Sequence, residues 1–84
     1  MKSIRWIQNV LIDGNRASLE IMIGVQNIAD RSYARVNQEQ EYWFNAQSSI
    51  RGDIIQQGLD ILRNQLANHQ VTKLDGQPFP WSEV

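Results

Sequence analysis

Two β-rich segments joined by a short turn constrain the fold of this chain more than any other feature of its sequence. Residues 3–13 are rich in β-branched and aromatic side chains, and apolar residues alternate with polar ones along residues 17–28. Between them lies Asp13-Gly14-Asn15. This triplet favours a tight turn, because glycine tolerates positive φ and Asp and Asn bond to nearby backbone groups. The pattern therefore predicts an antiparallel hairpin.

A second periodic pattern, over residues 47–68, predicts one long helix. Apolar residues recur there at steps of three and four positions, and polar residues fill the opposite side. Ser48 or Ser49 suits the N-cap position, because a serine oxygen accepts a bond from an unpaired backbone N–H. Gly58 lies beside the apolar stripe, which indicates close packing against a neighbouring element. The stripe consists of Ile50, Ile54, Ile55, Leu59, Ile61, Leu62 and Leu66.

The segment between the hairpin and the helix is less clearly patterned. Residues 33–36 predict a short third strand. For residues 38–46 two interpretations remain open, a fourth strand at about 41–45 or the first turns of the helix. The aromatic run Tyr42-Trp43-Phe44 favours the strand and the Gln and Glu content favours the helix. We place the strand slightly ahead.

Together these elements predict a single α+β domain over residues 1–76. Its antiparallel, three- to four-stranded meander sheet packs one face on the long amphipathic helix at about 47–68. Residues 71–74 predict a short strand after the helix. Residues 77–84 contain two prolines and predict an extended C-terminal arm. The arm carries Phe79 and Trp81, two large aromatic residues that should not remain in water. Either it packs back over its own sheet or it reaches into a neighbouring subunit.

Composition excludes several classes of chemistry. The chain has 84 residues, no Cys, one His and a formal charge of −1, so it has no disulfide framework and no thiolate zinc site. Ten Gln and seven Asn supply amides, which bind ligands but do not act as nucleophiles. We find no glycine-rich phosphate loop and no nucleophile elbow. The sequence predicts a protein that is not an enzyme, with no cofactor and no metal.

The sheet face away from the helix supplies the leading functional hypothesis. Ile7 and Leu11 of the first predicted strand share that face with Met22 of the second, while one helix can cover only the other face. An apolar patch of this kind usually marks an interface. With Phe79 and Trp81, these residues predict a non-enzymatic protein–protein binding or assembly module that acts as a homo-oligomer, on another protein, or both.

Such a module would be a small adaptor, an inhibitor or a structural subunit. A short, Cys-free, amide-rich α+β chain resembles, in general type, the accessory proteins of phages and mobile elements. A domain this small buries a modest core, and with disulfides excluded, oligomerisation is the remaining common source of stability.

The alternative hypothesis is a site for a small anionic ligand or a nucleotide. Arg31 and Arg35 flank Tyr33, and arginine forks bind phosphate or carboxylate and stack on aromatic rings. A nucleic-acid partner is disfavoured, because the chain lacks the basic excess that binding a polyanion needs.

No feature of the sequence indicates a membrane protein. The longest uninterrupted apolar run, residues 21–23, is far too short to span a bilayer. The N-terminal residues lack the apolar region of a signal peptide. We therefore expect a soluble, cytoplasmic protein.

Overall fold

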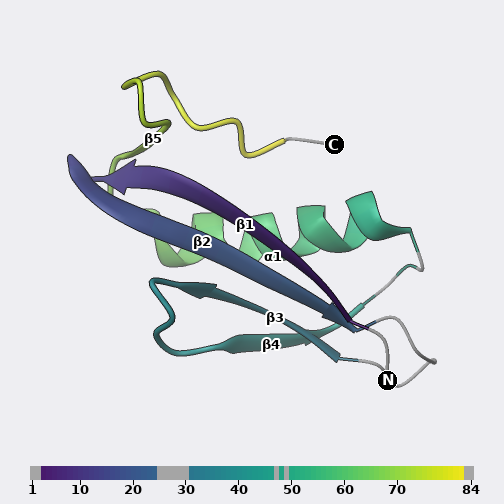
Figure 1. Ribbon diagram of the computed structural model, residues 1–84. Coiled ribbons are helices and arrows are strands. Elements are labelled where there is room, and N and C mark those ends of the chain that lie inside the picture. Colours follow the sequence, from purple (N-terminus) through teal and green to yellow (C-terminus); the bar gives the residue numbers. More distant parts are fainter. Residues whose placement is uncertain (1–2, 25–30, 47, 49, 83–84) are drawn as a thin grey trace.

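A curled antiparallel sheet with one helix packed against it forms the fold (Figure 1). This computed structural model describes residues 3–24, 31–46, 48 and 50–82. The sheet order is β4-β3-β2-β1-β5. The elements are β1 (Ser3–Ile12), β2 (Asn15–Gly24), β3 (Arg31–Val36), β4 (Tyr42–Asn45), α1 (Arg51–Gln65) and β5 (Val71–Thr72).

The predicted α+β class and the meander of the first four strands are confirmed. Residues 42–45 form β4, so the strand interpretation of that segment is correct. The strand predicted at residues 71–74 is confirmed over two residues, and it joins the predicted three- to four-stranded meander as a fifth strand, β5, beside β1, where Leu11 lies opposite Thr72. This strand has two residues, and the hairpin turn next to β1 also holds the residue before it, because Asp13 donates its N–H to the Gln70 carbonyl at 2.8 Å.

The predicted hairpin is confirmed and its turn is as short as the sequence indicates. Ile12 lies opposite Asn15, which leaves Asp13 and Gly14 as the two turn residues. Both have positive φ, 51° and 83°, as the tightest hairpin turns require. The second strand ends at Gly24, and the rest of its predicted span, residues 25–28, lies outside the described residues.

The helix is shorter at both ends than the predicted span of 47–68. It begins at Arg51, because Ile50 is extended (φ −85°, ψ 122°) and donates its N–H to Ser48 Oγ at 3.0 Å. Ser48 is therefore not the N-cap residue, and Ser49 lies outside the described residues. At the other end Leu66 leaves helical geometry (φ −103°, ψ 21°), which ends the helix before the predicted residue 68.

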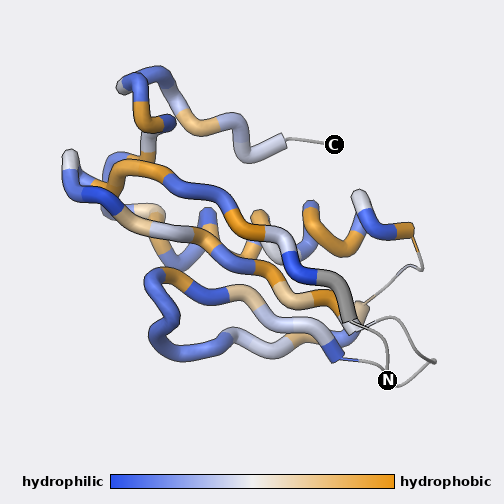
Figure 2. Tube along the Cα trace, viewed as in Figure 1, coloured by the Kyte–Doolittle hydropathy of each residue, from blue (hydrophilic) through white to orange (hydrophobic). Residues whose placement is uncertain are grey.

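The core lies between β2 and α1. Alternate residues of β2 point toward the helix, and hydropathy alternates along the middle of β2 accordingly (Figure 2). Gly58 allows α1 to approach the sheet, because a Cβ there would stand 2.7 Å from Cδ1 of Ile21. This confirms the close packing expected at Gly58. The buried hydrophobic cluster comprises Val10, Ala17, Leu19, Ile21, Ile23, Ala34, Ile54, Ile55, Leu59, Leu62 and Phe79.

The C-terminal segment closes the side of the fold between β1 and α1 (Figure 1). Phe79 is only 6% exposed and belongs to the core, and Trp81 packs against that core. The two rings meet edge to face with centroids 4.8 Å apart. Gln56 of α1 donates its side-chain amide to the Trp81 carbonyl at 2.9 Å. Of the two placements considered for this segment, the structure has it packed on its own chain.

Candidate functional site

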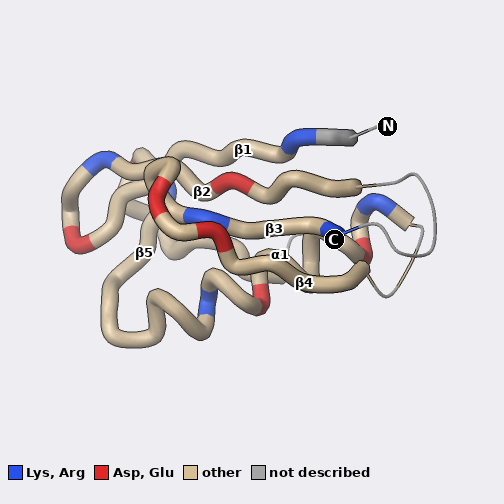
Figure 3. The backbone as a smooth tube through the Cα atoms, turned by 90° about the horizontal axis from the view of Figure 1, so that it is seen from below, with Lys and Arg blue, Asp and Glu red and all other residues tan. Residues whose placement is uncertain are grey.

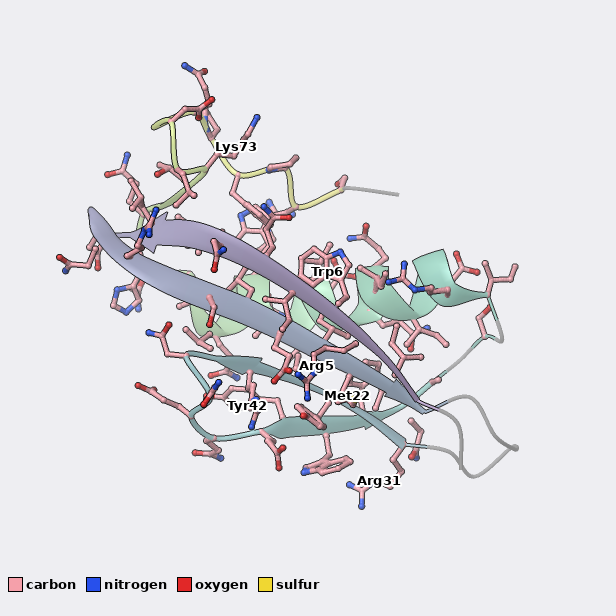
Figure 4. All side chains as sticks on the ribbon, in the orientation of Figure 1. Arg5, Trp6, Met22, Arg31, Tyr42 and Lys73 are labelled. Atoms are coloured by element: carbon pink, nitrogen blue, oxygen red, sulfur yellow. The ribbon has the colours of Figure 1, made fainter. Side chains whose placement is uncertain are left out.

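The face of the sheet opposite α1 is the candidate functional surface, and we call it the open face. Register decides its members, because successive side chains of a strand point to opposite faces. Arg5, Met22 and Arg31 lie on it, whereas Trp6 lies on the helix side (Figure 4). The open face includes Arg5, Ile7, Asn9, Leu11, Arg16, Ser18, Glu20, Met22, Arg31, Tyr33, Arg35, Trp43 and Asn45.

A buried carboxylate organises the charged half of the open face. Glu20 of β2 is 5% exposed and lies opposite Arg35 of β3, which donates Nε–H to its Oε1. Arg5 of β1 contacts the other oxygen, with Nε 2.9 Å from Oε2. Nη1 of Arg35 also lies 3.6 Å from Oε2 of Glu41, which precedes β4. Glu20 therefore ties three strands together and neutralises part of the charge of two arginines.

Stacked aromatic and guanidinium groups form the other half. The rings of Tyr33 and Trp43 lie 5.1 Å apart at 58°. The guanidinium of Arg31 lies 5.0 Å from the Trp43 ring, and that of Arg35 lies 5.2 Å from the Tyr33 ring. Trp43 nonetheless keeps 49% of its surface exposed. These cation–π contacts and the ion pairs of Glu20 form one continuous network across β4, β3, β2 and β1.

Tyr33 stands at the junction of the two halves and is 8% exposed. Burial raises the pKa of its phenol above the ordinary value, and the negative charge of Glu20 adds to that shift. The phenol therefore stays neutral at physiological pH, which suits a binding surface and gives no nucleophile.

Opposite charges alternate across this surface. Figure 3 shows positively and negatively charged residues on the neighbouring strands β1, β2 and β3. Arg5 and Arg35 share Glu20, and Arg35 also contacts Glu41. Among the described residues, Arg31 makes no ion pair with a carboxylate.

The structure unites most of the residues predicted to bind a ligand or a partner. Arg31, Tyr33 and Arg35 share the open face with Met22, and so does the pair Ile7 and Leu11, of which Ile7 is 51% exposed. The two predicted sites are therefore one surface. Phe79 and Trp81 lie apart from it, in the core between β1 and α1.

Trp43 and Glu20 are the members of this surface that the sequence did not single out. The aromatic run at residues 42–44 was a signal for Trp43, but only the register of β4 shows that it points away from the helix. Glu20 had no local signal, because its arginine partners lie 15 positions away on both sides.

His69, which has no partner near it in sequence, forms a pair with Asp13 of the hairpin turn. The imidazole Nδ1 lies 2.6 Å from Asp13 Oδ2, and Asp13 Oδ1 accepts the Gln70 N–H at 2.9 Å. Both hydrogen bonds hold the pKa of the Asp13 carboxyl below its ordinary value, and the bond to His69 has the larger effect. Both side chains are about half exposed, and this pair joins the turn to the start of β5.

We expect Asp13→Asn to make the free energy of unfolding depend less on pH in the acid range. A carboxyl whose pKa is lower when folded stabilises the fold above its unfolded pKa of about 4, and that stability is lost as pH falls through the folded pKa. Asparagine keeps the turn, since it also tolerates positive φ. Urea unfolding midpoints measured from about pH 6 down to about pH 2.5 test this. His69→Gln should act in the same direction, and superimposable profiles for Asp13→Asn and the wild type would contradict the prediction.

Comparisons of the chain with protein-family models, with curated proteins and with solved structures give no match. Among the described residues no group of three or more His, Asp or Glu side chains could hold a metal ion. In the same part of the chain, no helix is long and apolar enough to cross a membrane.

Proposed function

We propose that this chain is a non-enzymatic protein-binding module and that the open face is its contact surface. One observation carries the proposal: Trp43 is half exposed and yet held in place by contacts with the Arg31 guanidinium and the Tyr33 ring. Large aromatic and arginine side chains that are already ordered supply much of the binding energy at protein interfaces, because little conformational freedom remains to be lost.

The composition of the open face supports a protein partner. It contains Trp, Tyr, Met and four Arg and no Lys, which is the bias of the centre of protein interfaces. Its charges alternate in sign, because Glu20 is shared by Arg5 and Arg35. A polyanion would meet that carboxylate as well as the arginines, whereas a protein can present opposite charges in register.

The open face also has an apolar component that lacks a cover within the described chain. Ile7 is 51% exposed and Trp43 is 49% exposed. On the other face of the sheet, by contrast, α1 covers the core residues, and each of them is less than 10% exposed. An exposed apolar patch inside a polar surface is typical of an interaction site. This contrast between the two faces of one sheet supports the proposal that a protein packs on the open face.

We expect Trp43→Ser to weaken partner binding by about thirtyfold, the usual effect of losing one interface hot spot. Leu74→Ser is the matched control, because Leu74 is 46% exposed but lies in the turn after β5, away from the open face. Each chain is immobilised, incubated with lysate of the source cells, and its bound proteins are quantified. The proteins retained by wild type and by Leu74→Ser should be lost from Trp43→Ser, and equal retention by all three would refute the role of the open face.

A small anionic ligand such as a nucleotide is the second candidate for the same surface. Arg31 favours it, since this guanidinium stacks on an exposed indole and has no carboxylate partner among the described residues. A thermal-shift series with mono-, di- and triphosphate nucleotides separates the two proposals. Stabilisation that disappears in Arg31→Gln would favour the ligand, and unchanged melting temperatures would favour the protein partner.

A further inference from the structure

The outer edge of β1 is paired over only a small part of its length. All residues of Ser3–Ile12 pair with β2 on one side. On the other side only Leu11 and Ile12 have strand partners, in β5. The remaining stretch, residues 3–10, therefore presents an open strand edge at the end of the sheet.

Hairpin geometry identifies the backbone groups that point outward from this edge. A two-residue turn makes its flanking residues, Ile12 and Asn15, a hydrogen-bonded pair, so the even-numbered residues of β1 bond to β2. The odd-numbered residues Arg5, Ile7 and Asn9, together with Ser3, then direct N–H and C=O away from β2. Asp13 fits this alternation, since its N–H bonds outward to Gln70. No backbone hydrogen bond within the described part of the chain reaches Arg5, Ile7 or Asn9 from that side.

The edge lacks the features that usually prevent strand addition. Between residues 3 and 10 there is no proline, no lysine and no break in the pairing register that a bulge would produce. The C-terminal segment starts beside β5 but diverges from β1 toward the N-terminal end of that strand (Figure 1). The stretch is thus an unpaired strand edge to which another strand can be added.

We propose that the β1 edge pairs antiparallel with the β1 edge of a second copy of this chain, around a two-fold axis at Trp6. This register places Arg5 opposite Ile7 of the second copy and Ser3 opposite Asn9 of the second copy. It pairs every outward amide and carbonyl of residues 3–9 and uses none of the groups that β5 already engages. A two-fold axis requires such self-complementary contacts.

Charge and side-chain packing favour a second copy as the occupant. Arg5 is the only charged residue of the stretch, and it falls opposite an isoleucine rather than opposite another arginine. Its charge is already compensated by Glu20, 2.9 Å away. Trp6, which is partly buried, would face Trp6 of the second copy at a non-hydrogen-bonded position, where cross-strand aromatic pairs come closest.

The pairing of two β1 edges is independent of the proposed function. Its consequence for partner binding, however, rests on the proposal that the open face is a contact surface. A two-fold axis perpendicular to the sheet leaves both open faces on the same side of one continuous sheet. A dimer would then present two contact surfaces at a fixed separation, and a partner that engages both gains avidity.

A pair of substitutions at Ile7 tests the edge. Its N–H points outward, so Ile7→Pro should leave the hydrogen bonds to β2 intact while blocking the added strand. Ile7→Thr changes the side chain but keeps the N–H. By sedimentation velocity up to about 1 mM chain, we expect a wild-type dimer that weakens on the order of 100-fold in Ile7→Pro. In Ile7→Thr it should weaken by less than about fivefold.

Amide hydrogen exchange of the wild type tests the same proposal without a substitution. As concentration rises, the amides of Arg5, Ile7 and Asn9 should become protected, while Trp6, Gln8 and Val10 are protected throughout by β2. Trp43→Ser should leave the dimer intact, which separates this proposal from the function of the open face. A monomer at about 1 mM with those three amides unprotected would overturn the pairing. So would a dimer that survives Ile7→Pro, or one that Ile7→Thr weakens equally.

Discussion

Phe79→Ala is expected to lower the free energy of unfolding by about 3–5 kcal/mol, the usual cost of removing a buried aromatic ring. Phe79 is 6% exposed, belongs to the cluster around Leu19 and Leu59, and meets Trp81 edge to face at 4.8 Å. Alanine would leave a cavity and would also release the ring that holds Trp81. Since domains of this size are stabilised by about 5–15 kcal/mol, the loss is a large fraction of the total.

Urea denaturation followed by circular dichroism measures this effect. Leu74→Ala is the matched control from the same C-terminal segment, because Leu74 is 46% exposed and its truncation should change stability by less than about 0.5 kcal/mol. Equal effects of the two substitutions would show that residues 77–82 are not part of the core in solution. The result also bears on the arm hypothesis, because a segment that reaches into another subunit would make the loss depend on protein concentration.

Gly58→Ala is expected to destabilise the fold although alanine is the better helix former. A Cβ at this position would lie 2.7, 2.9 and 3.0 Å from Cδ1, Cγ1 and Cγ2 of Ile21. Ile21 is fully buried and β-branched, so it has few other rotamers available. Overpacking costs about 1–3 kcal/mol and the helix gains about 1 kcal/mol, which leaves a net loss of up to about 2 kcal/mol.

In a double-mutant cycle with Ile21→Ala, the effect of Gly58→Ala on the free energy of unfolding should change sign. Once the isoleucine side chain is removed, the Cβ added at position 58 meets no close atom from it, and Gly58→Ala should stabilise the protein by about 1 kcal/mol through helix propensity. Unfolding free energies of the four chains provide the measurement. If Gly58→Ala has the same effect with and without the Ile21 side chain, the contact between α1 and β2 is not as close as described.

Several features of the fold were predictable because short stretches of chain determine them. The Asp13-Gly14 turn, the alternation along β2 and the apolar stripe of α1 each depend on residues within one or two turns or strand repeats of one another. The expected close approach at Gly58 belongs with these, because a glycine beside an apolar stripe has a local meaning. The helix ends were not predictable, since Ile50 and Leu66 fit the apolar stripe but leave helical geometry.

The candidate site was predictable only in part. The alternation of Arg31, Tyr33 and Arg35 places them on one face of any strand, and Ile7, Leu11 and Met22 followed from the hairpin. That these two groups occupy the same face depends on the register between β2 and β3, which the sequence leaves open. The connecting residues carry no pattern that sets this register.

By itself, the sequence determined the hairpin, the helix, the α+β class and the presence of an arginine-rich and an apolar strand face. The tertiary structure decided how these were joined: Glu20 shared by Arg5 and Arg35, Trp43 beneath Arg31, Asp13 bonded to His69, and Phe79 in the core. The physical reason is range. Turn chemistry and periodicity act among neighbours in the chain, whereas each of these contacts joins residues brought together only by strand register and by the packing of the C-terminal segment.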